Sequence, residues 1–454
     1  MRLKAESLAS MCEAIVDCPH STPVWTNSGF IVLRNQNIKG GRLDLSSPSY
    51  TDEEHFKQRV RRMAPRAGDI VITREAPMGD VCKIPEGLIC CLGQRQVLLR
   101  PKAGVNSDYL LYALQSQSVQ DQIRWNEGTG STVSNIRIPV LEKIEIPRLG
   151  QAEETVAAAL KSINDKIDVN RRINQTLEAM ALAIFTSWFV DFDPVKAKIA
   201  ARVAGRDPLR TAISAISGKA DAEIDALPPE QYEQLAALAM LFPDEMDESA
   251  VVDIPKGWKV QPADSLSEVG IGKTPPRKEL QWFTEGQGEW RWVSIRDMGT
   301  SGVFQQRSSE YLTSEAVARF NVRVVPDRTV LLSFKLTIGR VAITDGPMAT
   351  NEAIAHFKLP CDAAVSSEYL YLYLKGFNYT TLGSTSSIAD AVNSKTIREM
   401  PIIVARRDLI DRFTKSVAPL FEEMRNRQNE IASLGATRDA LLPKLLSGEI
   451  EVFA

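Results

Sequence analysis

Side chains that can read the edges of DNA bases recur on predicted loops and strand ends in both halves of the chain. Arginine, lysine, asparagine, glutamine and small hydroxyl residues carry the donors and acceptors that such reading needs. For any one of them a turn residue or a solvated surface side chain is at least as good an explanation, and their recurrence is what suggests DNA binding. The first half offers Arg34, Asn35, Arg74, Gln94, Arg95, Gln96, Thr129, Ser131 and Thr132, and the second offers Arg296, Lys335, Asn351, Thr385 and Ser386.

No catalytic motif accompanies these side chains in the sequence. Residues 270–274 resemble the end of a phosphate-binding loop, but Ser267 stands where the first glycine is required and a proline pair follows. The three histidines and six cysteines lack metal-ligand spacing, and the cysteines form no C-x-x-C pair. The sequence therefore predicts a chain that is not an enzyme and has no cofactor or metal of its own.

Length and composition are those of an ordinary soluble globular protein. The 454 residues suffice for two or three domains, with 44% hydrophobic and 24% charged residues. No apolar run is long enough to cross a bilayer and no signal-peptide core opens the sequence, so we expect a cytoplasmic protein. The net charge of −3 averages a basic stretch at residues 57–66 with an acidic one at residues 221–253. Phosphate contact needs only a local basic patch, so this net charge argues only mildly against a nucleic-acid partner.

The elements that must position these side chains occur twice. Residues 1–150 carry short β-type runs, a helical stretch and a small polar loop, and residues 255–401 repeat this order. A repeat this long indicates two copies of one module. We therefore expect an α+β fold with two similar α/β domains, each on a mostly antiparallel sheet. The correspondences pair Thr73 with Ser333, Gly79 with Gly339, Tyr109 with Tyr369, and Ile146 with Met400.

A long heptad run follows each domain, at residues 151–190 and again at residues 402–454. Apolar residues that step by four and three keep one seam toward a partner helix. The two runs therefore predict a long antiparallel two-helix coiled coil that separates the domains. The alternative is two independent amphipathic helices, each lying on its own domain. In the paired arrangement Val156 faces Leu445, and Trp188 faces Phe413.

Polar residues interrupt this seam near its middle. Asn170 and Asn174 stand at seam positions of the first helix, and the pairing places them opposite the neighbourhood of Arg427. Polar seam residues fix register, so the three predict a polar layer. Between the two halves, residues 191–254 predict a partly helical connection.

Several segments closely resemble the specificity subunit of type I restriction-modification systems. The segments are residues 165–174 (DKIDVNRRIN), residues 187–193 (SWFVDFD), residues 242–244 (FPD), residues 254–258 (IPKGW) and residues 438–448 (RDALLPKLLSG). They stand in the family's order, and the resemblance covers essentially the whole chain. One departure is that the first half lacks the Ile-Pro-x-Gly-Trp lead-in that opens the second.

The resemblance implies a division of roles. Residues 1–150 and 255–401 would be target recognition domains that each read one part of a bipartite site in double-stranded DNA. The helices would set the spacing and dock two modification (methyltransferase) subunits, and restriction (translocase/nuclease) subunits would complete a bacterial defence complex. S-adenosylmethionine, ATP and Mg²⁺ would be used by the partner subunits. The base-contacting residues and the DNA sequence are not carried over, because recognition domains vary within the family.

Two other classes of function compete with this interpretation. A stand-alone methyltransferase would need a cofactor motif, which the sequence lacks. A coiled-coil scaffold joining two protein-binding domains would share the architecture but would not retard DNA in a bandshift assay.

Overall fold

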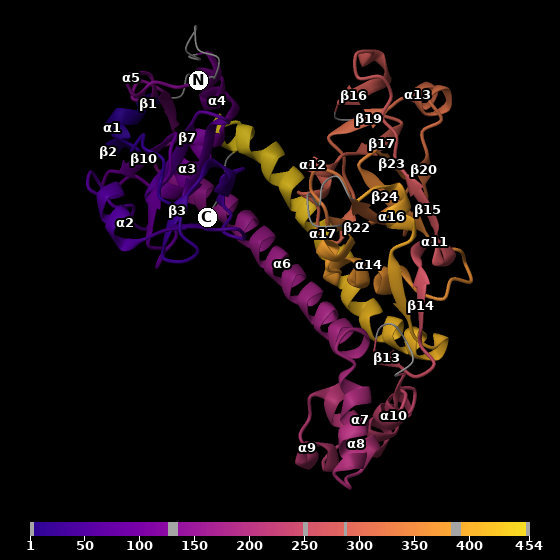
Figure 1. Cartoon of the computed structure of the whole chain (residues 1–454). Helices are drawn as coiled ribbons and strands as arrows, with labels where there is room; N and C mark the ends of the chain where they lie inside the picture. Colours follow the sequence, from indigo (N-terminus) through magenta and orange to yellow (C-terminus); the bar gives the residue numbers. More distant parts are fainter. Residues whose placement is uncertain (1–3, 126–134, 248–252, 286–287, 383–391, 451–454) are drawn as a thin grey trace. The chain divides into compact units, whose positions relative to one another are not determined.

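The computed structural model describes residues 4–125, 135–247, 253–285, 288–382 and 392–450. The chain divides into two compact units, Met1–Val169 with Ile431–Ala454, and Asn170–Glu430. Each unit holds one copy of the repeat together with part of each of two long helices (Figure 1). In the described part of the chain, no helix is long and apolar enough to cross a membrane.

Two small sheets frame the first domain. The larger has the order β2-β10-β7-β8 with antiparallel neighbours, and the smaller has the order β6-β3-β9 with β3 and β9 parallel. Alternate residues of β7 face opposite ways, so Ile70 and Ile72 join one core with α3, whereas Val71 joins another with Cys82. The bounds are β1 Lys4–Ser7, α1 Leu8–Met11, β2 Cys12–Asp17, β3 Phe30–Leu33, β4 Ile38–Lys39, β5 Arg42–Leu43, β6 Ser49–Thr51, α2 Glu53–Arg59, β7 Ile70–Arg74, β8 Met78–Lys83, β9 Cys90–Leu92, β10 Gln96–Pro101, α3 Ser107–Gln115, α4 Gln117–Trp125, α5 Ile138–Leu141 and β11 Glu145–Arg148.

The second domain repeats this frame. One sheet has the order β15-β24-β21-β22-β18 and the other β16-β19-β17-β23-β20. Val330 and Leu332 of β21 face one core while Leu331 faces another, as in β7. The bounds are β14 Lys259–Pro262, α11 Ala263–Leu266, β15 Glu268–Ile271, β16 Phe283–Glu285, β17 Trp290–Val293, α12 Ile295–Met298, β18 Phe304–Gln305, β19 Glu310–Leu312, α13 Ser314–Arg319, β20 Val324–Val325, β21 Val330–Ser333, β22 Val341–Thr344, β23 Met348–Thr350, β24 Ile354–Lys358, α14 Ser367–Gly376, α16 Ser394–Arg398 and β25 Pro401–Val404.

Matching hydrogen bonds confirm the tandem duplication. The hydroxyl of Thr73 accepts from the Asp80 N–H at 2.9 Å, and that of Ser333 accepts from the Arg340 N–H at 3.0 Å. The intervening Gly79 and Gly339 both have φ of 90°, a value that glycine adopts without steric cost. The hairpin between β7 and β8 is therefore built in the same way as that between β21 and β22.

One predicted correspondence is displaced by two residues. The Leu8 N–H donates to the carbonyl of Ile144, and the equivalent Ala263 N–H donates to that of Met400. Met400 therefore takes the place of Ile144, and the expected pairing with Ile146 was wrong. The numbering difference between the copies is 260 at Tyr109 and Tyr369 but 256 at Ile144 and Met400, so the second copy is four residues shorter between these points.

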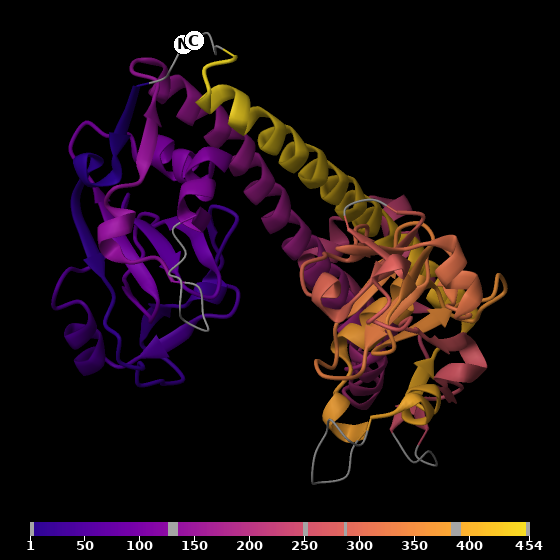
Figure 2. The ribbon, with the colours of Figure 1, turned by 90° about the horizontal axis from the view of Figure 1, so that it is seen from above.

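The two long helices, α6 (Ala152–Phe189) and α17 (Arg407–Leu446), run antiparallel to each other in each unit (Figure 2). In the second unit the rings of Trp188 and Phe413 lie 5.7 Å apart between centroids. In the first unit Val156 and Leu445 belong to one hydrophobic core. The ring contact and the shared core both agree with the pairing that the heptads predict.

The polar layer is present in the second unit. Arg427 Nη1 donates to Asn170 Oδ1 at 2.9 Å, and Asn170 Nδ2 donates to Glu430 Oε2 at 2.8 Å. Asn174 differs from expectation, because its Nδ2 donates to the main-chain carbonyl of Met424 at 3.2 Å. Two of the three residues predicted for the layer, Asn170 and Arg427, therefore bond directly, while the third, Asn174, bonds the main chain of α17.

Each domain is fastened to the helices by polar contacts. In the second unit the side-chain amide of Gln428 accepts from the Phe304 N–H and donates to the Phe304 carbonyl, both at 3.0 Å. In the first unit Asn164 on α6 donates to the Tyr112 hydroxyl at 3.0 Å and accepts from Arg438 of α17 at 3.0 Å. Such specific bonds orient each domain on its stretch of helix.

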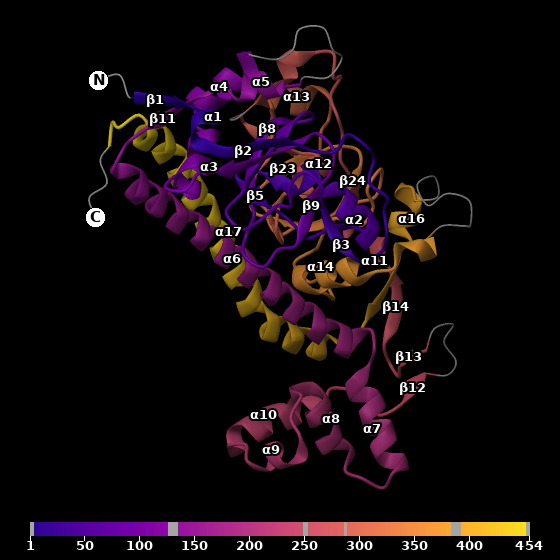
Figure 3. The same ribbon diagram turned by 90° about the vertical axis from the view of Figure 1, so that its left-hand side faces the viewer.

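Residues 191–254 contain a small helical bundle within the second unit (Figure 3). Its apolar core consists of Ala212, Ile213, Ile224 and Ala239. The Nε of Arg210 in α8 lies 2.8 Å from Oδ1 of Asp221 in α9, and this ion pair connects the two helices. The bounds are α7 Asp193–Val203, α8 Pro208–Ser217, α9 Asp221–Asp225, α10 Pro229–Ala239, β12 Met246–Asp247 and β13 Ile254–Pro255.

Candidate nucleic-acid interface

One edge of the first domain gathers most of its sequence-predicted residues. Strand pairing places Thr73 opposite Gln96 and Asp17 opposite Val97, so β2 and β7 end where β10 begins. The parallel strands β3 and β9 also end together, because Leu33 pairs with Leu92. The predicted set at these ends is Arg34, Asn35, Arg74, Gln94, Arg95 and Gln96.

Glu75, in the turn after β7, connects three of the neighbouring segments. Its main-chain carbonyl accepts from Asn35 Nδ2 at 2.6 Å. Its carboxylate accepts from Asn135 Nδ2 at 2.6 Å and pairs with Arg95 Nε at 3.3 Å. The side chains along this edge are therefore held in place before any ligand arrives.

Arg74 supports this edge from within the domain. Only 9% of the residue is exposed. Its Nη1 donates to Asp17 Oδ2 at 2.7 Å, and its Nε and Nη2 donate to Asn135 Oδ1 at 3.3 and 3.2 Å. Each guanidinium nitrogen donates one hydrogen bond within the domain, so Arg74 positions the neighbouring segments in this structure.

The two glutamines also bond within the domain. Gln96 is fully buried, and its Oε1 accepts from the Gly93 N–H at 3.2 Å. Gln94 is half-buried, and its Nε2 donates to the His20 carbonyl at 2.6 Å. These bonds shape the loop between β9 and β10.

Two arginines of the set are exposed at the same edge. The Arg34 guanidinium lies 5.3 Å from the ring centroid of Trp25, which is itself 46% exposed. The Arg95 side chain is 54% exposed, and its backbone has φ of 65°. Both cations can therefore reach a phosphate or a base edge outside the domain.

The second domain places its predicted residues at the corresponding edge. The Asn351 N–H donates to the carbonyl of Val293, the last residue of β17, at 3.0 Å. The Phe334 N–H donates to the Ala353 carbonyl at 3.0 Å, which brings the β21–β22 hairpin beside the same segment. Strands β17 and β23 (Figure 1) also end together, because Val293 pairs with Thr350. The turn after β21 lies beside these two strand ends. The predicted residues at this edge are Arg296 and Lys335, which are exposed, and Asn351, which is half-buried.

The turn after β3 and the turn after β17 are capped alike. The Asn37 side chain accepts from the Arg34 N–H at 2.9 Å, and that of Asp297 accepts from the Ser294 N–H at 2.8 Å. The likeness shows that the two edges are copies of one structure. Five predicted residues, Thr129, Ser131, Thr132, Thr385 and Ser386, lie outside the described residues.

Sequence reasoning missed the acidic and aromatic members of the first edge, and it could not show that one arginine of the basic run at residues 57–66 is buried. Asp17, Glu75 and Trp25 carried no signal, because their partners are distant in the sequence. Arg59 is buried and donates to the carbonyls of Leu92 and Gly93 at 2.8 and 2.9 Å. Burial lowers its pKa, and its role is to bind the strand end. This arginine is structural and is not part of an exposed basic patch.

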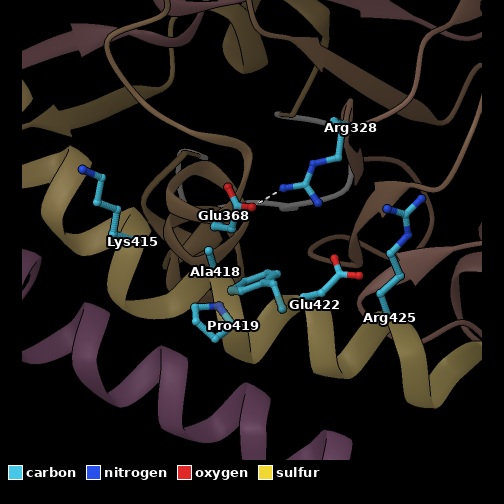
Figure 4. A pocket seen from close by; sticks show the side chains of 8 residues that line it. Arg328, Glu368, Lys415, Ala418, Pro419, Glu422 and Arg425 are labelled. Carbon is cyan, nitrogen blue, oxygen red and sulfur yellow. Dashed lines mark hydrogen bonds and ion pairs between the residues drawn. The ribbon is translucent and has the colours of Figure 1, made fainter.

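A separate pocket of about 580 Å³ lies beside α17 in the second unit. Figure 4 shows Lys415, Pro419 and Glu422 on successive turns of the helix. Arg328 donates to Glu368 and, at 2.9 Å, to the Ser367 hydroxyl, so this guanidinium is paired within the domain. The lining residues are Arg328, Glu368, Lys415, Ala418, Pro419, Phe421, Glu422 and Arg425.

Two features make this pocket receptive to a polar partner. Lys415 and Glu422 are exposed, so each can pair with an opposite charge. Pro419 has no N–H, so it cannot supply the usual helix hydrogen bond to the Lys415 carbonyl.

Within the described ranges, no group of histidines, cysteines and acidic residues could hold a metal ion.

Comparisons with known proteins match both copies of the repeat. The family model for the type I restriction modification DNA specificity domain matches residues 23–179 and 255–405. The type I restriction enzyme HindI specificity subunit of Haemophilus influenzae is 32% identical over 337 residues, 71% of this chain and 71% of that protein. The MjaIX specificity subunit of Methanocaldococcus jannaschii is 25% identical over 417 residues, 88% of this chain and 81% of that protein. The crystal structure of a type I restriction-modification system S subunit from M. genitalium is 14% identical, with a TM-score of 0.48 over 98% of this chain and 96% of that one.

Proposed function

Because this chain belongs to the type I restriction-modification DNA specificity subunits, we propose that each of its two domains reads one part of a bipartite site in double-stranded DNA. Specificity subunits are the non-catalytic, sequence-recognising components of these systems. The observation that carries the proposal is the duplicated edge, where exposed Arg34 and Arg296 lie on the matching turns after β3 and β17. Arginine and lysine there can bind phosphates and read guanine, and nearby amides can read adenine.

The long helices have a second role in this proposal. They set the spacing between the two parts of the site and dock two modification (methyltransferase) subunits. The pocket beside α17 supports docking, because its exposed Lys415 and Glu422 offer both signs of charge on one helix face. Restriction subunits complete the complex, and S-adenosylmethionine, ATP and Mg²⁺ are used by the partner subunits.

Mapping methylated sites tests the reading role. The chain is expressed with its partner subunits in a host that lacks other methylation, and methylated adenines are located with and without it. A single bipartite motif that depends on the chain is expected. Methylation that ignores the chain, together with no retardation of duplexes by the complex, would instead favour a scaffold for protein partners.

Variants at the two edges test which part of the DNA site each domain reads. Arg95→Ala should relax selection in one part, and the double variant Arg296→Ala with Lys335→Ala should relax it in the other. The matched control is Lys102→Ala, because Lys102 follows the opposite end of β10 and is exposed. Equal effects of all three variants on both parts would contradict the assignment.

Docking is tested by charge reversal in the pocket. Lys415→Glu with Glu422→Lys should weaken assembly with the methyltransferase subunits, as measured by native mass spectrometry of the mixed subunits. The matched control is Lys395→Glu on α16, another exposed lysine of the second unit. Unchanged assembly of the pocket variant would remove this face from the docking surface.

A further inference from the structure

The tip of the β21–β22 hairpin presents an unusual residue, Leu336. It is 93% exposed. The Thr337 N–H donates to the Lys335 carbonyl at 2.7 Å, so the chain reverses in three residues with Leu336 at the centre. Its φ of 62° lies in the left-handed region, which a leucine side chain rarely adopts.

Two unfavourable features therefore coincide at one residue. A large hydrocarbon side chain in water forgoes the gain that burial would give. A tight turn with positive φ is the usual place for glycine or asparagine, which adopt it at little cost. Backbone strain of this kind is typical of functional positions, because the surrounding structure must enforce it.

The surroundings do enforce it. The Ser333 hydroxyl donates to the Thr337 carbonyl at 2.6 Å and accepts from the Arg340 N–H at 3.0 Å. Arg340 Nη1 donates to the Ile295 carbonyl at 2.6 Å, which ties the hairpin to the start of α12. These hydrogen bonds therefore hold the hairpin tip, and Leu336 with it, in a fixed conformation.

The tip stands at the candidate DNA edge of the second domain. Phe334, two residues before Leu336, bonds the Ala353 backbone there, and Lys335 is exposed beside it. The corresponding residue of the first domain is Ala76, whose φ of 41° is also positive. Both hairpins therefore have a positive φ at this residue, and the large apolar side chain is present in the second domain.

We propose that Leu336 contacts the 5-methyl group of a thymine in the major groove and so selects thymine at one position of the second domain's half-site. This inference rests on the proposed DNA-reading function. The thymine methyl is the apolar feature that the major groove displays, and a small apolar contact distinguishes it from cytosine and from the purines. The neighbouring cations at this edge bind phosphate and hold the tip in the groove.

The test pairs a protein change with a DNA change. The full complex with its methyltransferase subunits is assembled from wild-type chain, Leu336→Asn or Leu336→Gly, and binding is measured on duplexes in which each thymine of the half-site is replaced in turn by deoxyuridine. Asparagine and glycine both accept positive φ, so the hairpin is retained. For wild type, one replacement should weaken binding by about fourfold, the effect of one methyl-sized apolar contact. Neither variant should respond to that replacement.

The controls distinguish a failure of this inference from a failure of the proposed DNA-reading function. Leu280→Asn changes another exposed leucine of the same domain, 76% exposed, and should leave the deoxyuridine response intact. The other half-site should be read normally by every variant. The role of Leu336 would be overturned if deoxyuridine weakened binding equally in wild type and variants. It would also be overturned if no thymine replacement weakened binding of the wild type. Failure of the wild-type complex to select any sequence would overturn the proposed function instead.

Discussion

Adding one heptad to each long helix tests whether the helices set the spacing of the DNA site. The boundary between the two units falls at Val169/Asn170 in α6 and at Glu430/Ile431 in α17. A copy of residues 163–169 inserted after Val169, with a copy of residues 431–437 inserted after Glu430, continues both seams because the repeat is seven. The polar contacts described above lie within single units and are kept.

The size of the effect follows from helix geometry. Seven residues at about 1.5 Å each lengthen the paired helices by roughly 10 Å. At roughly 3.4 Å per base pair this corresponds to about three base pairs. Three base pairs also turn the duplex by roughly a quarter turn, given about 10.5 base pairs per turn. Absorbing that rotation deforms DNA or protein, so we expect affinity to fall by about tenfold or more.

A series of duplexes measures this prediction. Both half-sites are kept and the spacer varies from two base pairs shorter to five longer, and binding and methylation are measured with the partner subunits. The preferred spacer should increase by about three base pairs. A heptad in α6 alone should abolish recognition, because it leaves the facing helix unmatched. An unchanged preferred spacer at unchanged affinity would refute the idea that the helices measure distance.

Three further outcomes concern stability. Gln428→Ala leaves the buried peptide groups of Phe304 without their partner and should lower the free energy of unfolding by about 1–3 kcal/mol in urea titrations, whereas an unchanged midpoint would contradict the anchoring role. Leucine at both Asn170 and Arg427 should keep or raise the thermal midpoint, and Asn170→Leu alone should lower it by calorimetry; the reverse order would contradict the pairing. Burial lowers the pKa of His356 to about 3, so the unfolded chain takes up a proton first. The contribution of His356 to the free energy of unfolding should then fall by roughly 1.4 kcal/mol per pH unit as the pH drops from about 6.5 to 3. The free energy of unfolding should therefore fall more steeply in the wild-type protein than in His356→Gln.

Periodic features of the sequence predicted the fold well. The four-three stepping fixed which seam residues face each other, and the contact between Trp188 and Phe413 follows from it. Such patterns are local and repeat many times, so single exceptions do not change them. The pairing of Ile146 with Met400 failed because the second copy is four residues shorter between Tyr369 and Met400 than the first is between Tyr109 and Ile144, and such a deletion leaves no periodic trace.

The site was less predictable, because residue type does not reveal which side chains are already engaged. Arg74 has the chemistry of a DNA reader, yet its partner Asp17 lies 57 residues away in the sequence and holds it inside the domain. For Leu336 the sequence failed in the opposite way, because its residue type gave no reason to propose it as a DNA-contacting residue. A single apolar residue in a loop carries no pattern, and only its backbone angle and exposure in the structure distinguish it.

The bond between Gln428 and the second domain has an evolutionary consequence. It uses only the N–H and carbonyl of Phe304, groups that every residue except proline possesses. The Gln428 bond therefore tolerates any substitution at position 304 except proline. The Phe304 ring is a separate constraint, because it is buried and lies edge-on to Phe421 of α17 with 6.4 Å between ring centroids. Divergence of this domain can therefore keep the main-chain bond but must still supply a side chain that packs on Phe421.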